Sequence, residues 1–309
     1  MITGYFTHPD CQQHDMGAGH PESPQRLRAI NELLEAGGLL HDLQAIHPAP
    51  AEKADLSMAH SASSIQLVHD RSPITGIVSL DADTSMNAHS LDAALLAAGA
   101  GLAATKAVLE GKINNAFCAV RPPGHHAEHD LPMGFCLFNN IAIAALYALQ
   151  QDNIERVAIL DFDVHHGNGT QEIFYNNPNV LYISSHQYPF YPGTGSTNEK
   201  GKHNNILNLP LDSGTAGEIF LNSYDTAFKK LKEFKPEFIL LSSGFDAHIN
   251  DPLAQINLTS DDFYTITKRF VDYAKTNCDG KIISILEGGY DLDGLRESAY
   301  QHVKALIEN

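Results

Sequence analysis

Short, uninterrupted runs of apolar and β-branched residues recur along the chain, and longer stretches with helical spacing separate them. Continuous apolar runs are typical of parallel strands that are buried on both faces of a sheet. They predict strands over residues 115–120, 156–162, 180–184, 237–243 and 281–287. The intervening patterns predict helices over residues 24–36, 90–109, 139–150, 216–233, 260–275 and 291–307.

Strands that alternate with helices predict a three-layer α/β/α fold with a mostly parallel sheet. The sequence has no internal repeat, low-complexity tract or long linker, so we expect one domain over residues 1–309. We also expect no apolar stretch of membrane-spanning length and no membrane partner. The first residues lack the basic start and apolar run of a signal peptide, which favours a cytoplasmic location.

Acidic residues outnumber basic ones, with 37 Asp and Glu against 20 Lys and Arg, and the formal net charge is −17. This excess argues against a nucleic-acid partner and would favour cationic ones. The cysteines at positions 11, 118, 136 and 278 form no Cys-x-x-Cys pair, so we expect buried free thiols. The 17 histidines are numerous and partly clustered, which is the first indication of chemistry.

Chemically active groups gather just after the predicted strands. Parallel α/β sheets bind their ligands beyond the carboxyl ends of the strands. The segments at these ends are 121–126 (RPPGHH), 163–169 (DVHHGNG), 244–246 (GFD) and 288–290 (GGY). Because the strands themselves are almost purely apolar, this sorting predicts a functional site at one edge of the sheet.

Asp161, Asp163 and His165 stand two residues apart, so their side chains share one face of an extended segment. Two ligands from this segment and Asp246 from another strand end could bind a metal ion and leave one position open for water. That pattern is typical of catalytic rather than structural zinc. In isolation these residues could merely cap the following helix, but their place beside the other strand ends favours the metal site.

His125 and His126 follow a Pro-Pro-Gly turn, which can direct both rings toward one cavity. A histidine titrates near pH ~6.5, so at neutral pH it can accept a proton and later return it. A carboxylate behind one ring would orient it, and Asp161 is the candidate. Tyr290 follows two glycines, and its hydroxyl could donate to an oxyanion that forms on an attacked carbonyl.

A series of motifs runs from residue 19 to residue 290. They are GHPESPQRL (19–27), RPPGHH (121–126), GFCLFNN (134–140), DFDVHHGNGT (161–170), YPGTG (191–195), GFD (244–246) and EGGY (287–290). In this order they resemble the histone deacetylases, in particular the class II and bacterial amidohydrolase branch of the arginase/deacetylase superfamily. The resemblance covers essentially the whole chain and implies a central eight-stranded sheet.

The resemblance also implies roles for individual residues. It implies one zinc ion bound by Asp163, His165 and Asp246, with His126 as general base and acid. His125 would be its electrostatic partner, backed by Asp161, and Tyr290 would polarise the acetyl carbonyl. Structural potassium is implied as well, at a first site formed by Asp161, Asp163, His165 and Ser184 and a second formed by backbone oxygens around Phe174, Asn177 and Val180.

The resemblance further implies a substrate tunnel, and its residues are Gly134, Phe135, Tyr191, Leu253, Gly288 and, at the rim, Asp83. Aromatic walls suit the apolar stem of lysine, which has a polar tip. Leu253 stands where acetylpolyamine-specific relatives carry a glutamate, which favours acyl-lysine. Asn168 stands where some relatives have a second aspartate, so a neutral amide would orient His126.

The sequence therefore predicts a zinc-dependent deacetylase that acts on an acetylated lysine peptide or protein, in an oligomer or alone. Three alternatives remain open. The first is hydrolysis of acetylpolyamines or other small acetylated amines, and the second is a ureohydrolase with two manganese ions. The third is a non-catalytic acyl-lysine binder or acetoin-regulatory protein, although the complete set of catalytic residues argues against it. Fe²⁺ could occupy the same ligands as zinc.

Overall fold

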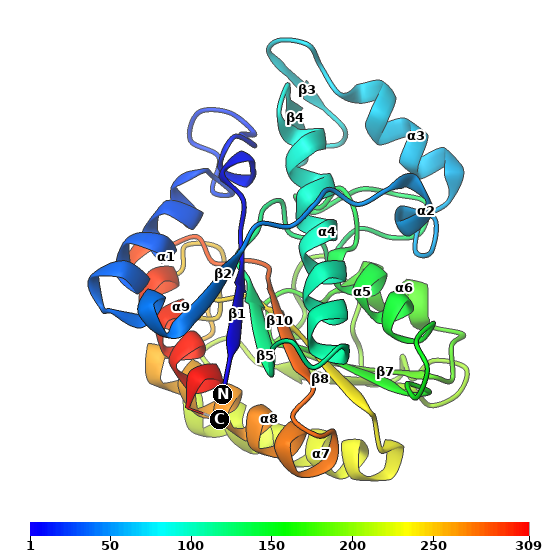
Figure 1. Cartoon of the computed structure of the whole chain (residues 1–309), viewed down its shortest axis with the longest axis vertical. Helices are drawn as coiled ribbons and strands as arrows, with labels where there is room; N and C mark the ends of the chain where they lie inside the picture. The colour runs from blue at the N-terminus through cyan, green and yellow to red at the C-terminus, as the bar shows by residue number, and fades with distance from the viewer. Residues whose placement is uncertain (309) are drawn as a thin grey trace.

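A computed structural model describes residues 1–308 and shows a sheet covered by helices on both faces (Figure 1). The sheet has eight strands in the order β2-β1-β5-β10-β9-β6-β7-β8, and every pair is parallel. The strands are β1 (Thr3–Phe6), β2 (Leu43–Ile46), β5 (Asn115–Cys118), β6 (Val157–Asp161), β7 (Val180–Gln187), β8 (Ile206–Leu211), β9 (Phe238–Ser243) and β10 (Ile282–Leu286). The predicted α/β/α fold with an eight-stranded parallel sheet is confirmed.

The five predicted strands correspond to β5, β6, β7, β9 and β10, which are five of the six interior strands of the sheet. Every residue of these strands is buried, as their continuous apolar character indicates. The predictions differ from the observed bounds by up to three residues. They omit β1, β2 and β8, and they end β7 too early, because it continues through the polar residues Ser185, His186 and Gln187.

Helices form a layer on each face of the sheet. In Figure 1, α4 (Ser90–Leu109), α5 (Asn140–Ala148) and α6 (Asn168–Phe174) lie on one side. On the other side lie α1 (Gln25–Ala36), α7 (Gly217–Phe234), α8 (Ser260–Asn277) and α9 (Leu292–Ile307). All of these except α6 were predicted. Two more helices, α2 (Lys53–Leu56) and α3 (Ala62–Arg71), and the antiparallel hairpin of β3 (Ile77–Ser79) and β4 (Ser85–Asn87) project beyond the sheet.

Helix α4 is long and apolar enough to cross a membrane, judged by length and composition alone, so the expectation that no stretch of that length exists was wrong. However, 61% of its apolar window is buried inside the structure. The helix packs on α5, β5 and β10. This burial is what the core helix of an α/β protein requires.

The four cysteines are buried and free, as expected from their spacing. Strands β5, β6, β9 and β10 all run in the same direction, so their carboxyl ends meet at one edge of the sheet. The segments that follow these ends are those in which the sequence concentrates histidine, aspartate and tyrosine.

Candidate metal centre and active site

Asp163, His165 and Asp246 converge beyond the ends of β6 and β9. One potential ligand atom from each lies within 4.8 Å of the others, and all three side chains are buried. Nδ1 of His165 is 3.2 Å from Oδ1 of Asp163 and 3.1 Å from Oδ2 of Asp246. Residues remote in sequence thus form one compact set of oxygen and nitrogen ligands.

Two glycines make the room for these carboxylates. A Cβ atom at Gly244 would overlap Asp163, and a Cβ atom at Gly288 would overlap both Asp246 and Asp163. The N–H of Gly288 instead donates to Oδ2 of Asp163 at 2.8 Å. Gly288, predicted to bind substrate, therefore lies against the carboxylates and does not line the cavity described below.

The two carboxylates of this cluster have histidines as their charge partners. Asp163 and Asp246 form ion pairs with histidines, and within residues 1–308 no Lys or Arg pairs with them. Burial and the Asp163 charge raise the pKa of Asp246 to about 7. Burial opposes a charge on His165 as well, but the two carboxylates raise its pKa to about 10. A divalent metal ion fits this set of two carboxylates and one imidazole, and it could replace the proton that the carboxylates favour on His165.

Neighbouring carboxylates favour the protonated form of His125. Its Nδ1 donates to Oδ2 of Asp161 at 3.0 Å, and the Tyr182 hydroxyl donates to the same oxygen at 2.8 Å. Burial alone would lower the pKa of His125, but the carboxylates of Asp161, Asp163 and Glu287 raise it well above the usual value. The predicted carboxylate behind one histidine ring is therefore present.

His126 is held as a neutral ring with a defined tautomer. Asn168 uses its amide NH₂ to donate to Oε1 of Glu128 at 2.7 Å, so its Oδ1 faces Nδ1 of His126 at 2.8 Å as an acceptor. Nδ1 must then carry the proton, and Nε2 retains a free lone pair. Burial, together with the charges of His125 and His165, lowers the pKa of His126 well below the usual value. This neutral ring can accept a proton.

Tyr290 is anchored by its own loop. Its N–H donates to Oδ2 of Asp251 at 2.7 Å. The Arg26 guanidinium lies 5.1 Å from the centre of its ring and donates to the carbonyls of Gly289 at 2.6 Å and Glu287 at 2.5 Å. The tyrosine is therefore fixed on both sides, and neither Arg26 nor Asp251 was singled out from the sequence.

A cavity of about 200 Å³ leads to these groups. Its wall includes Phe190, which the sequence analysis missed and which stacks on His165 with ring centres 5.6 Å apart. The Tyr191 ring meets the His126 ring edge-on at 5.2 Å, and Phe135 meets Tyr290 at 5.8 Å. The full lining is Asp83, His126, Gly134, Phe135, His165, Phe190, Tyr191, Leu253 and Tyr290.

The Phe135 wall depends on an unusual backbone. Gly134 has φ +58°, and a Cβ atom there would overlap the His126 ring. Phe135 itself has φ +67°, a left-handed conformation that costs a non-glycine residue about 1 kcal/mol or more. Its N–H donates to Oγ1 of Thr84 at 3.0 Å, which ties this wall to the β3–β4 turn that carries Asp83.

Comparison with known proteins decides which family this geometry belongs to. The profile of the histone deacetylase domain matches residues 20–306. The chain belongs to the histone deacetylase family. It is 40% identical over 315 residues to the histone deacetylase-like amidohydrolase of Pseudomonas aeruginosa, covering 96% of this chain and 83% of that protein.

Other members of the histone deacetylase family agree. A probable deacetylase of Archaeoglobus fulgidus is 39% identical over 300 residues, which cover 95% of this chain and 83% of the relative. The crystal structure of the HDA15 HD domain superposes with a TM-score of 0.94 at 36% identity, and the match covers 100% of this chain and 88% of that chain. The resemblance inferred from the motifs is confirmed, and membership supports a metal-dependent deacetylase.

The residues predicted for potassium fall into two groups in this deacetylase. Asp161 and Ser184 are register partners at the ends of β6 and β7, and both are buried. They lie together with Asp163 and His165 at the edge of the sheet. The carbonyls of Phe174, Asn177 and Val180 also converge, but on a side-chain amide rather than on an open position.

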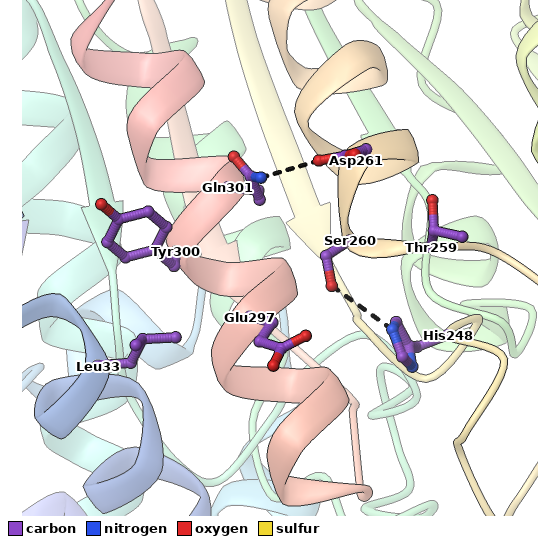
Figure 2. Close-up of a pocket in the computed structure, with 8 residues that line it drawn as sticks. All are labelled: Leu33, His248, Thr259, Ser260, Asp261, Glu297, Tyr300 and Gln301. Atoms are coloured by element: carbon purple, nitrogen blue, oxygen red, sulfur yellow. Dashed lines mark hydrogen bonds between the residues drawn. The ribbon is translucent and has the colours of Figure 1, made fainter. Parts of the chain in front are cut away.

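A second hollow, of about 410 Å³, is lined by none of Asp163, His165 and Asp246 (Figure 2). Ser260 and His248 face each other there, with Oγ and Nε2 3.5 Å apart. The N–H of Asn250 donates to Nδ1 of His248 at 3.3 Å, so Nε2 carries the ring proton. A protonated Nε2 cannot deprotonate Ser260, and the pair is therefore no nucleophile and base.

Glu287 is a further buried residue that sequence reasoning missed. Its Oε2 accepts the N–H groups of Gly124 at 2.7 Å and His125 at 3.1 Å, and its Oε1 accepts the Ser242 hydroxyl at 3.2 Å. It fixes the turn that carries the histidine pair. The one signal in the sequence is a carboxylate that directly ends an apolar strand, which by itself does not distinguish a buried from an exposed residue.

Proposed function

We propose that this chain is a zinc-dependent amidohydrolase that removes acetyl or related acyl groups from the ε-amine of lysine in peptides or proteins. One observation carries the proposal: Asp163, His165 and Asp246 meet within 4.8 Å, and His165 also lines the aromatic cavity together with His126 and Tyr290. A metal ion held by these three residues would lie at the same cavity as His126, the proposed base, and Tyr290, the proposed hydroxyl donor.

Asp163, His165 and Asp246 would hold one Zn²⁺ ion, and Fe²⁺ is the competing metal. When bound, the ion would act as a Lewis acid toward the acyl oxygen and would lower the pKa of a water molecule. The remaining ligand position would have to stay open for these partners. A potassium ion near Asp161 and Ser184 is a separate proposal with a structural role.

The residues of the chain provide the proton transfers. Nε2 of His126 would take a proton from the attacking water while the water oxygen forms a bond to the acyl carbon. The Tyr290 hydroxyl would donate to the oxyanion that develops at that carbon. The C–N bond would then break, with the proton passing from the histidine pair to the departing amine, and the products are acetate and a free amine.

The cavity supports acyl-lysine as the substrate. Phe135, Phe190 and Tyr191 present aromatic surface to a passage of about 200 Å³, which suits four methylenes followed by an amide. Leu253 at the same cavity supplies no charge for a second amine. Asp83 is the observation that favours the alternative, an acetylpolyamine, because its carboxylate lies on the lining and could pair with a distal ammonium group.

Turnover of an acetyl-lysine peptide and of acetylputrescine by chelated and metal-restored protein tests the proposal. We expect no turnover after chelation, recovery with one equivalent of Zn²⁺ per chain and preference for the peptide. His126→Ala should reduce kcat by roughly 10²–10⁴-fold. Unchanged peptide hydrolysis in His126→Ala would refute the assigned base, and full activity in the chelated protein would refute the metal.

A further inference from the structure

Three backbone carbonyls and one side-chain amide meet at the junction of α6, β7 and β8. Nδ2 of Asn205 lies 2.9 Å from the oxygen of Phe174, 3.0 Å from that of Asn177 and 3.1 Å from that of Val180. These are the carbonyls that the family resemblance assigns to a second potassium ion.

The two possible occupants of this position exclude each other. Carbonyl oxygens that point at one spot make a concentrated negative potential, which a monovalent cation or a hydrogen-bond donor can satisfy. Nδ2 of Asn205 lies 2.9–3.1 Å from all three oxygens, so a cation that contacted the same three oxygens from this side would overlap it. Because carbonyls only accept, the amide of Asn205 must present its NH₂ group there rather than its oxygen.

The surroundings hold Asn205 in this orientation. Its own carbonyl accepts the N–H of Tyr182 at 2.9 Å, which fixes the backbone beside the first residue pair of β7 and β8. Its Oδ1 accepts the N–H of His203 at 3.3 Å, and the residue is 3% exposed. Gly201 has φ +68°, and a Cβ atom there would overlap the Asn205 amide. The loop is thus shaped to admit this side chain.

We infer that the Asn205 amide replaces a cation at this site, so that this chain does not bind the second potassium ion. The prediction of potassium at Phe174, Asn177 and Val180 does not fit the structure, because an NH₂ group of the protein itself lies within hydrogen-bond distance of the same three oxygens. The amide joins the end of α6 to the start of β7 and of β8 without any dependence on the salt in solution. The inference does not rest on the proposed catalytic function.

The test removes the amide and asks whether a cation takes its place. Asn205→Ala empties the centre of the carbonyl cluster, and Asn205→Asp keeps the size of the side chain but replaces the donor by an oxygen. Asn115→Ala is the matched control, because Asn115 is also buried and its amide donates to a single carbonyl, that of Leu306, at 2.8 Å. Thallium(I), a spectroscopic substitute for potassium, measures the number of bound ions, and melting is compared in KCl and in tetramethylammonium chloride.

We expect Asn205→Ala and Asn205→Asp to bind one Tl⁺ ion per chain more than the wild type does. Their melting temperatures should be several degrees higher in KCl than in tetramethylammonium chloride, beyond any such difference in the wild type. Asn115→Ala should lose stability equally in both salts and bind no additional ion. A variant that folds only in KCl would also support the inference.

Equal Tl⁺ stoichiometry in the wild type and in both Asn205 variants would overturn the inference, whatever that stoichiometry is. Variants that lose the same stability in both salts, or that fold in neither, would overturn it too. In those cases the amide would be an ordinary buried hydrogen-bond donor, and no cation could substitute for it.

Discussion

Two buried charged clusters lie close to Tyr290, and they are neutralised in opposite ways. In the first, Asp163 and Asp246 pair with histidines and, among residues 1–308, with no Lys or Arg. In the second, Glu22 accepts from Arg26 at 3.0 Å and from two nitrogens of Arg121, one of them at 2.5 Å. All of these side chains are almost completely buried.

The two clusters differ in which groups supply the positive charge, and this difference distinguishes a site that can bind a ligand from one that only supports the fold. A carboxylate that is buried beside guanidinium groups already has its counter-charge, and burial without one would be costly. The cluster around Glu22 therefore needs nothing from solution, and through Arg26 it supports the Tyr290 loop. The carboxylates around Asp246 are balanced only by histidine protons, and a metal ion could take the place of those protons.

Asp246→Asn is the strongest test of this difference between the two clusters, because it removes one negative charge and keeps the side chain nearly the same size. We expect kcat/KM to fall by roughly 10³-fold or more, since several kcal/mol of charge stabilisation would be lost with the metal. The melting temperature of the chelated protein should instead rise, because burial and the charge of Asp163 both disfavour the Asp246 carboxylate in the folded chain. Activity assays and thermal melts of chelated protein measure the two effects. A fall in stability of the chelated variant would mean that the cluster is balanced without an ion.

Glu22→Gln, in the second cluster, should lower the stability of the protein whether or not a metal is bound. Two arginines would remain buried without a counter-charge, so we expect a loss of about 3–5 kcal/mol in the free energy of unfolding. Denaturant titration measures this loss, and chelator should not change its size. A loss below about 1 kcal/mol would show that the guanidinium groups reach water or other acceptors.

His302 represents a third arrangement, in which a buried group stays uncharged. It contacts the hydroxyls of Thr267 at 2.6 Å and Ser284 at 2.8 Å, and burial lowers its pKa from 6.5 to about 3. Between these values the unfolded chain binds a proton that the folded chain does not, so stability falls as the pH decreases from 6.5.

The measurement is the unfolding free energy of wild type and His302→Gln between pH 7 and pH 5. The wild type should lose roughly 1.4 kcal/mol per pH unit more than the variant once the pH is below 6.5, or about 2 kcal/mol in total at pH 5. Parallel curves for the two proteins would assign the acid sensitivity to other groups.

The smallest expected effect concerns the cavity. Leu253→Glu would add a carboxylate beside Asp83, and attraction of a distal ammonium group should shift the ratio of kcat/KM values toward acetylputrescine by about tenfold, or 1.4 kcal/mol. Leu253→Gln is the neutral control. Equal ratios in both variants would show that charge at this position does not select the substrate.

The sequence predicts the interior of the sheet better than its margins. Strands β5, β6, β9 and β10 are buried throughout, so their apolar runs are continuous. Edge strand β2 has the sequence LQAI and is half exposed, and β8 contains Pro210, which only a strand with a free edge accommodates well. Neither shows the pattern of a buried strand, although each pairs along its whole length with one neighbour.

The functional site likewise contains some residues that the sequence predicts and others that it does not. The convergence of Asp163, His165 and Asp246, the contact of His125 with Asp161 and that of His126 with Asn168 could be predicted, because these residues lie in dense motifs at strand ends. Supporting residues such as Glu287 and Asn205 could not. Their roles depend on which distant backbone groups lie near them in the folded chain. A single glutamate or asparagine in the sequence does not predict those partners.

The left-handed backbone at Phe135 lowers stability, whereas its aromatic side chain forms part of the cavity wall. A glycine there would adopt φ +67° without strain, so Phe135→Gly would relieve the local backbone but remove an aromatic wall. Selection of variants for heat resistance alone would therefore tend to erode the binding passage at this residue, whereas selection for turnover would retain the strained phenylalanine.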